Sequence, residues 1–135
     1  MDDVDNKILE TLRQNSRTPN NEIADKLGLT EGTIRNRIKR LIETGVIKKF
    51  TIETQPVQTE AIVLIRTQTG RSKETLRKIR RHVDRLFETA GEYDIAAYLT
   101  ADEIATINGI VDKLRTVEGI TSTVTLLKIA DDKTT

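Results

Sequence analysis

The sequence predicts an α+β protein in two parts, a helical N-terminal part and a C-terminal part in which helices pack on one antiparallel sheet. Up to Gly45, apolar residues recur at the three- and four-residue spacing of amphipathic helices. From Ala61 onward, short apolar runs typical of strands alternate with two further helical patterns. A polar stretch containing Pro56 separates the two patterns. The expected boundaries are residues 1–52 for the first domain, 53–60 for the linker, 61–130 for the second domain and 131–135 for a frayed tail.

The segment 17–47 carries the start and stop signals of two helices joined by a tight turn. Thr18 can cap the first of these helices, and Gly28 can adopt the positive φ that ends it. Thr30 can cap the second helix, and Gly45 can close it. This is the layout of a helix-turn-helix, whose second helix enters the major groove of DNA.

Two further elements complete the first domain as a winged helix-turn-helix. An opening helix is predicted over about 4–15, with acidic residues at its positive end. Its apolar stripe should pack under the helix-turn-helix and consists of Val4, Ile8, Leu9 and Leu12. The segments 46–47 and 50–52 are predicted as a strand, either a wing or the way out of the domain.

The second helix of the helix-turn-helix has two chemically distinct sides. One side is an apolar stripe made of Ile34, Ile38, Leu41 and Ile42. The other side is polar and basic, as phosphates require, and Asn or Arg near the helix start can reach base edges. Thr33 and Asn36 are therefore the candidates for base contacts. The full predicted DNA-binding set is Thr30, Thr33, Arg35, Asn36, Arg37, Lys39, Arg40, Lys48 and Lys49. The plainer alternative is a solvated basic face on an ordinary helical hairpin.

The second domain shows the element order β-α-β-β-α-β. Its predicted elements are a strand at 61–65, a helix capped by Ser72, strands at 86–89 and 93–99, a helix that begins with a capping box at 100–103, and a strand at 120–129 after Gly119. The buried stripe of the second helix is expected at Ile104, Ile107, Val111 and Leu114. This order predicts a ferredoxin-like sandwich, whose exposed sheet face should seek a partner.

Composition excludes several classes of protein. The 135 residues carry a formal net charge of +1, and the basic excess gathers on the second helix of the helix-turn-helix. Because Cys is absent, disulfides and thiolate metal sites are excluded. No apolar run is long enough to span a bilayer and no signal-peptide pattern is present, so we expect a cytoplasmic protein with no membrane partner.

Several short segments resemble the Lrp/AsnC family of bacterial and archaeal transcription regulators, in order and spacing over essentially the whole chain. The matching segments are 2–9, 15–17, 22–24, 28–30, 37–41, 45–47, 91–94 and 117–125. One departure is the stretch between Phe50 and Ala61, which is shorter than in most members and lacks their usual glycine. The resemblance points to an archaeal origin and to a sequence-specific regulator rather than an enzyme.

The resemblance also implies partners. Members of the family form homodimers that often assemble into a ring of four dimers, an octamer. They bind an amino acid between sensing domains, and this changes their assembly or DNA affinity. Two recognition helices of a dimer would suit a palindromic operator in double-stranded DNA. No other cofactor is expected.

Carried over residue by residue, the family's effector pocket comprises Gly91, Glu92, Tyr93, Asp94, Thr121, Ser122 and Thr123. Carboxylates there can accept from an ammonium group, while backbone N–H groups and hydroxyls can donate to a carboxylate. The two carboxylates of this set, Glu92 and Asp94, weakly favour an effector with a basic side chain, such as lysine or arginine. The alternative is structural, with a hairpin turn at Gly91, an Asp94 that satisfies backbone groups, and threonines that simply favour strands.

Two other functions fit the same architecture. Siroheme decarboxylases share it and act on a tetrapyrrole, but the one histidine, His82, lies among arginines and no catalytic set is visible. An architectural protein with little sequence preference would suit the Lys39-Arg40 and Lys48-Lys49 pairs. The modest net charge argues against that alternative.

Overall fold

The computed structural model describes residues 1–54 and 58–132. Its contacts divide the chain into two compact units, Met1–Thr54 and Gln55–Thr135. The middle of the predicted linker, with Pro56, and the end of the predicted tail lie outside the described residues. Within those residues, none of the helices combines the length and the apolar character that crossing a bilayer requires.

Three helices make up the first unit: α1 (Asp3–Gln14), α2 (Asn20–Leu27) and α3 (Glu31–Glu43). Their predicted stop and start signals at the turn are confirmed, because Gly28 has φ 67° and the Thr30 hydroxyl accepts from the Thr33 N–H at 3.3 Å. At the other end of α3, Gly45 also has a positive φ, of 79°. The helix-turn-helix is therefore present as predicted.

The cap predicted for α2 is wrong. Pro19 occupies the N-cap position in an extended conformation, and its carbonyl accepts from the N–H groups of Glu22 and Ile23. The Thr18 hydroxyl instead donates to the carbonyl of Asn15 at 2.7 Å. Thr18 therefore stabilises the end of α1, where unpaired carbonyls also need donors.

The core of the first unit lies where the three helices meet. Ile8, Ile23 and Ile34 are fully buried there, one from each helix. Ile42 was expected in the same stripe, but 47% of its surface is exposed. At about 100° per residue it lies roughly 80° around α3 from Ile34, at the edge of the stripe, where the other helices do not cover it.

No strand forms between α3 and the second unit, so the strand predicted at 46–47 and 50–52 is wrong for the described chain. The Ile47 N–H donates to the Leu41 carbonyl at 3.0 Å and ties the segment back to α3. Phe50 and Ile52 remain 51% and 75% exposed. A strand requires a neighbouring strand for its backbone hydrogen bonds, and the described residues of the first unit supply none.

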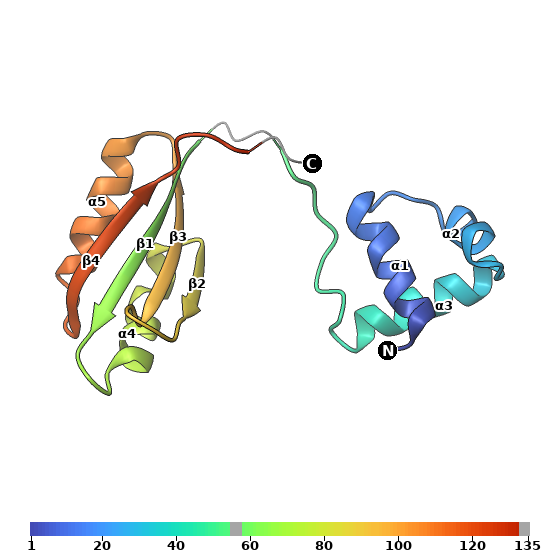
Figure 1. Ribbon diagram of the computed structural model, residues 1–135, viewed down its shortest axis with the longest axis horizontal. Helices are drawn as coiled ribbons and strands as arrows, with labels where there is room; N and C mark the ends of the chain where they lie inside the picture. The colour runs from blue at the N-terminus through green and yellow to red at the C-terminus, as the bar shows by residue number, and fades with distance from the viewer. Residues whose placement is uncertain (55–57, 133–135) are drawn as a thin grey trace. The chain divides into compact units, whose positions relative to one another are not determined.

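The second unit is a sheet with helices on one side (Figure 1). Its elements are β1 (Thr59–Thr67), α4 (Ser72–Ile79), the 3₁₀ turn η1 (Arg80–His82), β2 (Arg85–Glu88), β3 (Ile95–Ala101), α5 (Ile104–Arg115) and β4 (Ile120–Leu127). The strand order is β2-β3-β1-β4, and every neighbouring pair is antiparallel. This is the predicted ferredoxin-like sandwich, and the α+β fold class is confirmed.

The two faces of the sheet differ in burial because successive strand residues point to opposite sides. On β1, Ala61, Val63 and Ile65 are buried beneath α4 and α5. On the other face, which we call the open sheet face, large apolar side chains remain exposed. They include Ile62, Phe87, Val124 and Leu126. The helices thus bury the apolar side chains of one face of the sheet, and no described element covers the other face.

Both helix starts predicted in the second unit differ from the structure. Ser72 is the first residue of α4 rather than its cap, and its hydroxyl donates to Glu88 at 3.3 Å. Thr100 belongs to β3, where its N–H and hydroxyl donate to Asp84 at 2.6 and 3.1 Å, so the capping box does not form. Ile104, expected in the buried stripe of α5, is the first helical residue and is 51% exposed.

Candidate nucleic-acid interface and effector site

The start of α3 presents polar side chains to solvent. The hydroxyls of Thr30 and Thr33 lie 2.9 Å apart, so the cap residue and the first-turn threonine are hydrogen-bonded to each other. Asn36 is exposed and lies one turn beyond Thr33. Its amide offers both a donor and an acceptor, the pair that an adenine edge requires.

The basic residues around this surface are held to different degrees. Arg35 is paired with Glu31 at 2.8 Å one turn earlier, but both side chains are largely exposed and the pair can exchange with a phosphate. Arg40 lies 3.8 Å from Asp5 and is also exposed. Among the described residues, no ion pair engages the exposed side chains of Lys39, Lys48 and Lys49.

Arg37 has a different environment. Its guanidinium donates to Asp2 at 2.5 Å and to Asp5 at 3.3 Å, and the Asp5 side chain is only 4% exposed. The Arg37 guanidinium, with help from the Asp5 N–H, lowers the pKa of Asp2 to about 2. Asp2 and Asp5 also form the capping box of α1. The sequence-based set placed Arg37 among the DNA contacts, to a phosphate or to a base, whereas its guanidinium joins α3 to the start of α1.

The turn predicted to hold an effector is tied to the end of β1. Gly91 has φ 121°, and the Thr89 hydroxyl donates to the Tyr93 carbonyl at 2.7 Å. Asp94 accepts from both the N–H and the hydroxyl of Thr67, at 2.7 and 3.2 Å. One oxygen of Asp94 thus has the structural role that the alternative reading gave it.

Arg66 joins the two halves of the predicted pocket. Its guanidinium donates to the Glu92 carboxylate at 2.7 Å and lies over the Tyr93 ring, 4.9 Å from the centroid. The Thr121 hydroxyl donates to the Arg66 carbonyl at 3.3 Å, and Ser122 lies opposite Arg66 in the sheet register. Sequence reasoning missed Arg66. The sequence did contain a signal for it. Arg66 is a charged residue near the end of β1, and by strand alternation it lies on the same face as Ile62 and Leu64, the open sheet face.

Thr123 is the one member of the predicted set that lies elsewhere. It pairs with the buried Ile65 on the helix-covered face, and its hydroxyl accepts from Arg115 of α5 at 3.0 Å. Ser122 and Thr123 are adjacent in sequence, so they lie on opposite faces of β4. The structure therefore gathers Gly91 to Asp94 and Ser122 around Arg66. Thr121 bonds to the Arg66 carbonyl where the register between β1 and β4 shifts, and Thr123 lies apart.

No metal-binding cluster is present within 1–54 and 58–132, where His, Asp and Glu do not gather in groups of three or more with suitable geometry. His82 lies in η1, and its Nε2 accepts from Arg81 at 3.4 Å. The described surroundings of His82 are basic, with no carboxylate in hydrogen-bond contact. Nothing there resembles a nucleophile–histidine–acid arrangement.

Known proteins match both units. A family described as winged helix-turn-helix DNA-binding matches residues 1–48. The HTH-type transcriptional regulator LysM of Sulfurisphaera tokodaii is 39% identical over 91% of this chain and 91% of its own length. The HTH-type transcriptional regulator FL11 of Pyrococcus furiosus is 34% identical over 100% of this chain and 93% of its own. These relatives are named as regulators, which excludes the enzyme alternative.

Solved structures share the whole architecture. Escherichia coli AsnC has a TM-score of 0.82 with 25% identity, covering 97% of this chain and 93% of that chain. Bacillus subtilis LrpC has the same fold, with a TM-score of 0.80 over 100% of this chain and 99% of that chain. The relatives, the solved structures and the described helix-turn-helix agree with the resemblance seen in the sequence. The chain therefore belongs to the Lrp/AsnC family of DNA-binding transcription regulators, among archaeal relatives.

Proposed function

We propose that the protein reads a palindromic operator through the start of α3, with Thr33 and Asn36 contacting bases. The observation that carries this proposal is the exposed amide of Asn36, one turn beyond a capped helix start and near cations without acidic partners in the described chain. Lys39, Lys48 and Lys49 supply phosphate contacts that position the helix, and Arg35 joins them when Glu31 releases it.

Substitution of the base-contacting residues tests this proposal. We expect Asn36→Ala or Thr33→Ala to reduce the preference for operator over random DNA by roughly 1–3 kcal/mol per lost contact. Fluorescence anisotropy with both DNAs, at one fixed salt concentration, measures the difference. The exposed Asn6→Ala in α1 is the matched control and should leave specificity unchanged. Unchanged specificity in both test variants would show that another face of α3 reads the DNA.

The proposal extends to an α-amino acid that binds around Arg66. The Arg66–Glu92 ion pair offers one group for each charge of a zwitterion, the guanidinium for its carboxylate and the Glu92 carboxylate for its ammonium. Both side chains are exposed enough to exchange partners, at 43% and 75%. Two more distant structural relatives, one from Neisseria meningitidis and one from Mycobacterium tuberculosis, were solved with L-methionine and share this fold.

The structure does not support the weak preference for a lysine or arginine effector that the sequence suggested. Glu92 is already paired with Arg66, and Asp94 accepts from Thr67. Since Glu92 is assigned to the ammonium of the amino acid and one oxygen of Asp94 is held by Thr67, the described contacts do not favour a lysine or arginine side chain. The site as described fits the backbone charges of any amino acid, and its side-chain preference depends on surroundings beyond these residues.

A thermal-shift panel with the twenty amino acids tests the effector proposal. A bound amino acid at about 100 times its dissociation constant should add roughly 2.7 kcal/mol of stability. Glu92→Gln should abolish the response, whereas Glu88→Gln, an exposed glutamate on β2, should retain it. Glu92 is a better target than Asp94, whose removal would also break two bonds to Thr67. A flat panel with the unaltered protein would contradict the proposal.

We also propose that the working form is a homodimer, which can assemble further to an octamer. The exposed apolar side chains of the open sheet face support this, because a second copy would remove them from water. The segment 48–54 supports it too, since no backbone hydrogen bond ties it to another element of the described chain. A second copy could supply the neighbouring strand that this segment lacks.

A further inference from the structure

Positive charge in the second unit is concentrated in one segment. Residues 71–85 hold 7 of the 12 Lys and Arg found in 55–135, but only 2 of its 12 Asp and Glu. The segment folds as α4, η1 and the start of β2. A unit with no formal net charge therefore carries a strongly basic surface on one of its helices.

The two acidic residues of this segment are already occupied. Glu74 pairs with Arg71 at 3.3 Å and with Lys78 at 3.0 Å, and these two cations lower the pKa of its carboxyl to about 2. Asp84 accepts from the N–H of Thr100. Among the described residues, Arg77, Arg80 and Arg81 are exposed and have no ion pair. We call Arg77, Arg80 and Arg81 with Lys78 the α4–η1 face.

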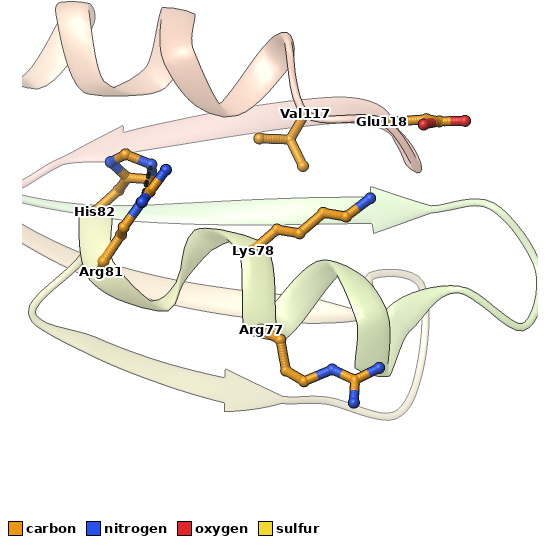
Figure 2. A pocket seen from close by; sticks show the side chains of 6 residues that line it. All are labelled: Arg77, Lys78, Arg81, His82, Val117 and Glu118. Atoms are coloured by element: carbon orange, nitrogen blue, oxygen red, sulfur yellow. Dashed lines mark hydrogen bonds between the residues drawn. The ribbon is translucent and has the colours of Figure 1, made fainter.

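A hollow of about 470 Å³ borders this face, where the turn before β4 comes close to α4 (Figure 2). It is lined by Arg77, Lys78, Arg81, His82, Val117 and Glu118. Figure 2 shows Lys78 extending toward Glu118 and Arg81 beside His82. Glu118 lies 3.5 Å from Arg71, so its charge is partly compensated. The hollow therefore has cationic walls and is open to solvent.

This arrangement costs helix stability, since Arg77 lies three and four residues before Arg80 and Arg81, and like charges at that spacing repel. The fold itself does not need these side chains, because they are exposed and make no described ion pair. An anion would offset the repulsion. Arginine binds phosphate through two parallel N–H donors, and three of the four residues of the face are arginines.

We propose that the α4–η1 face contacts the phosphate backbone of the DNA that α3 holds. Once α3 is bound, the chain keeps the second unit close to the same duplex, so weak contacts gain a high effective concentration. Phosphate contacts carry no sequence information, and the face would therefore bind DNA that flanks the operator. This function goes beyond base reading and does not depend on an amino-acid effector.

The test compares two variants of the full chain that each lose two positive charges. Arg77→Gln/Arg81→Gln alters the face, and Lys113→Gln/Arg115→Gln on α5 is the matched control. Affinity is measured against salt concentration with a short operator duplex and with a long duplex that adds flanking DNA. Each lost phosphate contact lowers the slope of log affinity against log salt by ~0.9. We expect a slope lower by ~1.8 for the face variant on the long duplex, and the unaltered slope for the control.

Two results would overturn the proposal. If the face variant and the control have equal salt slopes on the long duplex, the α4–η1 face does not contact DNA. A thermal shift by inorganic phosphate that the face variant loses, with unchanged DNA slopes, would assign the hollow to a small anion instead. If the unaltered protein binds neither duplex, the proposed operator recognition by α3 is wrong. That outcome differs from the two results above, which concern only the α4–η1 face.

Discussion

At the scale of single residues, Arg37 lies on the DNA-recognition helix but is held by the protein's own carboxylates. Asp2 and Asp5 cap α1 and also accept from the Arg37 guanidinium, so one pair of acids fixes two helices. Asp5 is almost completely buried, and a buried carboxylate requires a cation or hydrogen-bond donors. We infer that Arg37 positions α3 and that its neighbours contact the phosphates.

Substitution of Arg37 separates positioning from DNA contact. Arg37→Gln should lower the melting temperature, because it leaves the buried Asp5 without its closest cation. Its salt slope for DNA binding should stay near the unaltered value, whereas Lys39→Gln should lower the slope by ~0.9 with little change in melting temperature. Arg35→Gln, on the exposed side of α3, is the control for stability. A stable Arg37→Gln protein with a reduced slope would return Arg37 to the phosphate contacts.

At the scale of elements, helix existence was predictable, and so was the Thr30 N-cap of α3, but the other predicted N-caps were wrong. The stripes of α1, α3 and α5 follow from residue spacing, and most of their members are buried. Ser72 and Thr100, both plausible caps, bond instead to Glu88 and Asp84 on other elements. A hydroxyl takes the best acceptor that the fold brings near it, and the local sequence does not contain that acceptor.

The turn between α5 and β4 is a case in which a prediction from the local sequence, a glycine before the last strand, agrees with the structure. Gly119 was predicted to come directly before the last strand, where it lies with φ 104°, although α5 ends earlier, at Arg115. A Cβ at this position would lie 2.9 Å from the Thr75 hydroxyl of α4, so glycine is required by space as well as by conformation. Thr75 is buried there and donates to the Arg71 carbonyl. The glycine thus lets β4 begin directly beside α4.

At the scale of the whole molecule, the open sheet face predicts self-association. Ile62 and Leu126 are paired across β1 and β4 and are 45% and 52% exposed. We expect Leu126→Glu to convert the protein to a species of half the mass or less, because a charge cannot be buried unpaired between two sheets. Light scattering after size-exclusion chromatography measures the mass. Ile129→Glu is the control, since Ile129 is fully exposed beyond the end of the sheet.

The mass of the unaltered protein bears on the proposal directly. A dimer, or an even multiple of it up to the octamer, would support burial of the open sheet face. A monomer at working concentration would contradict it, and so would a Leu126→Glu protein that keeps the unaltered mass. If Ile129→Glu also dissociates the protein, added charge rather than the sheet face would be responsible.

The order of the helices and of the sheet strands, the turn glycines, the polar side of α3 and the family follow from the sequence alone, because apolar periodicity and turn chemistry are local properties of the chain. The strand predicted after α3 did not form, because it has no neighbouring strand in the described chain. Tertiary structure determined how the charged groups are partnered. Arg37 bonds to Asp2, 35 residues away, and Arg66 bonds to Glu92, 26 residues away. Such pairs depend on which helix ends and strand ends meet in space, and no spacing rule within one element encodes them.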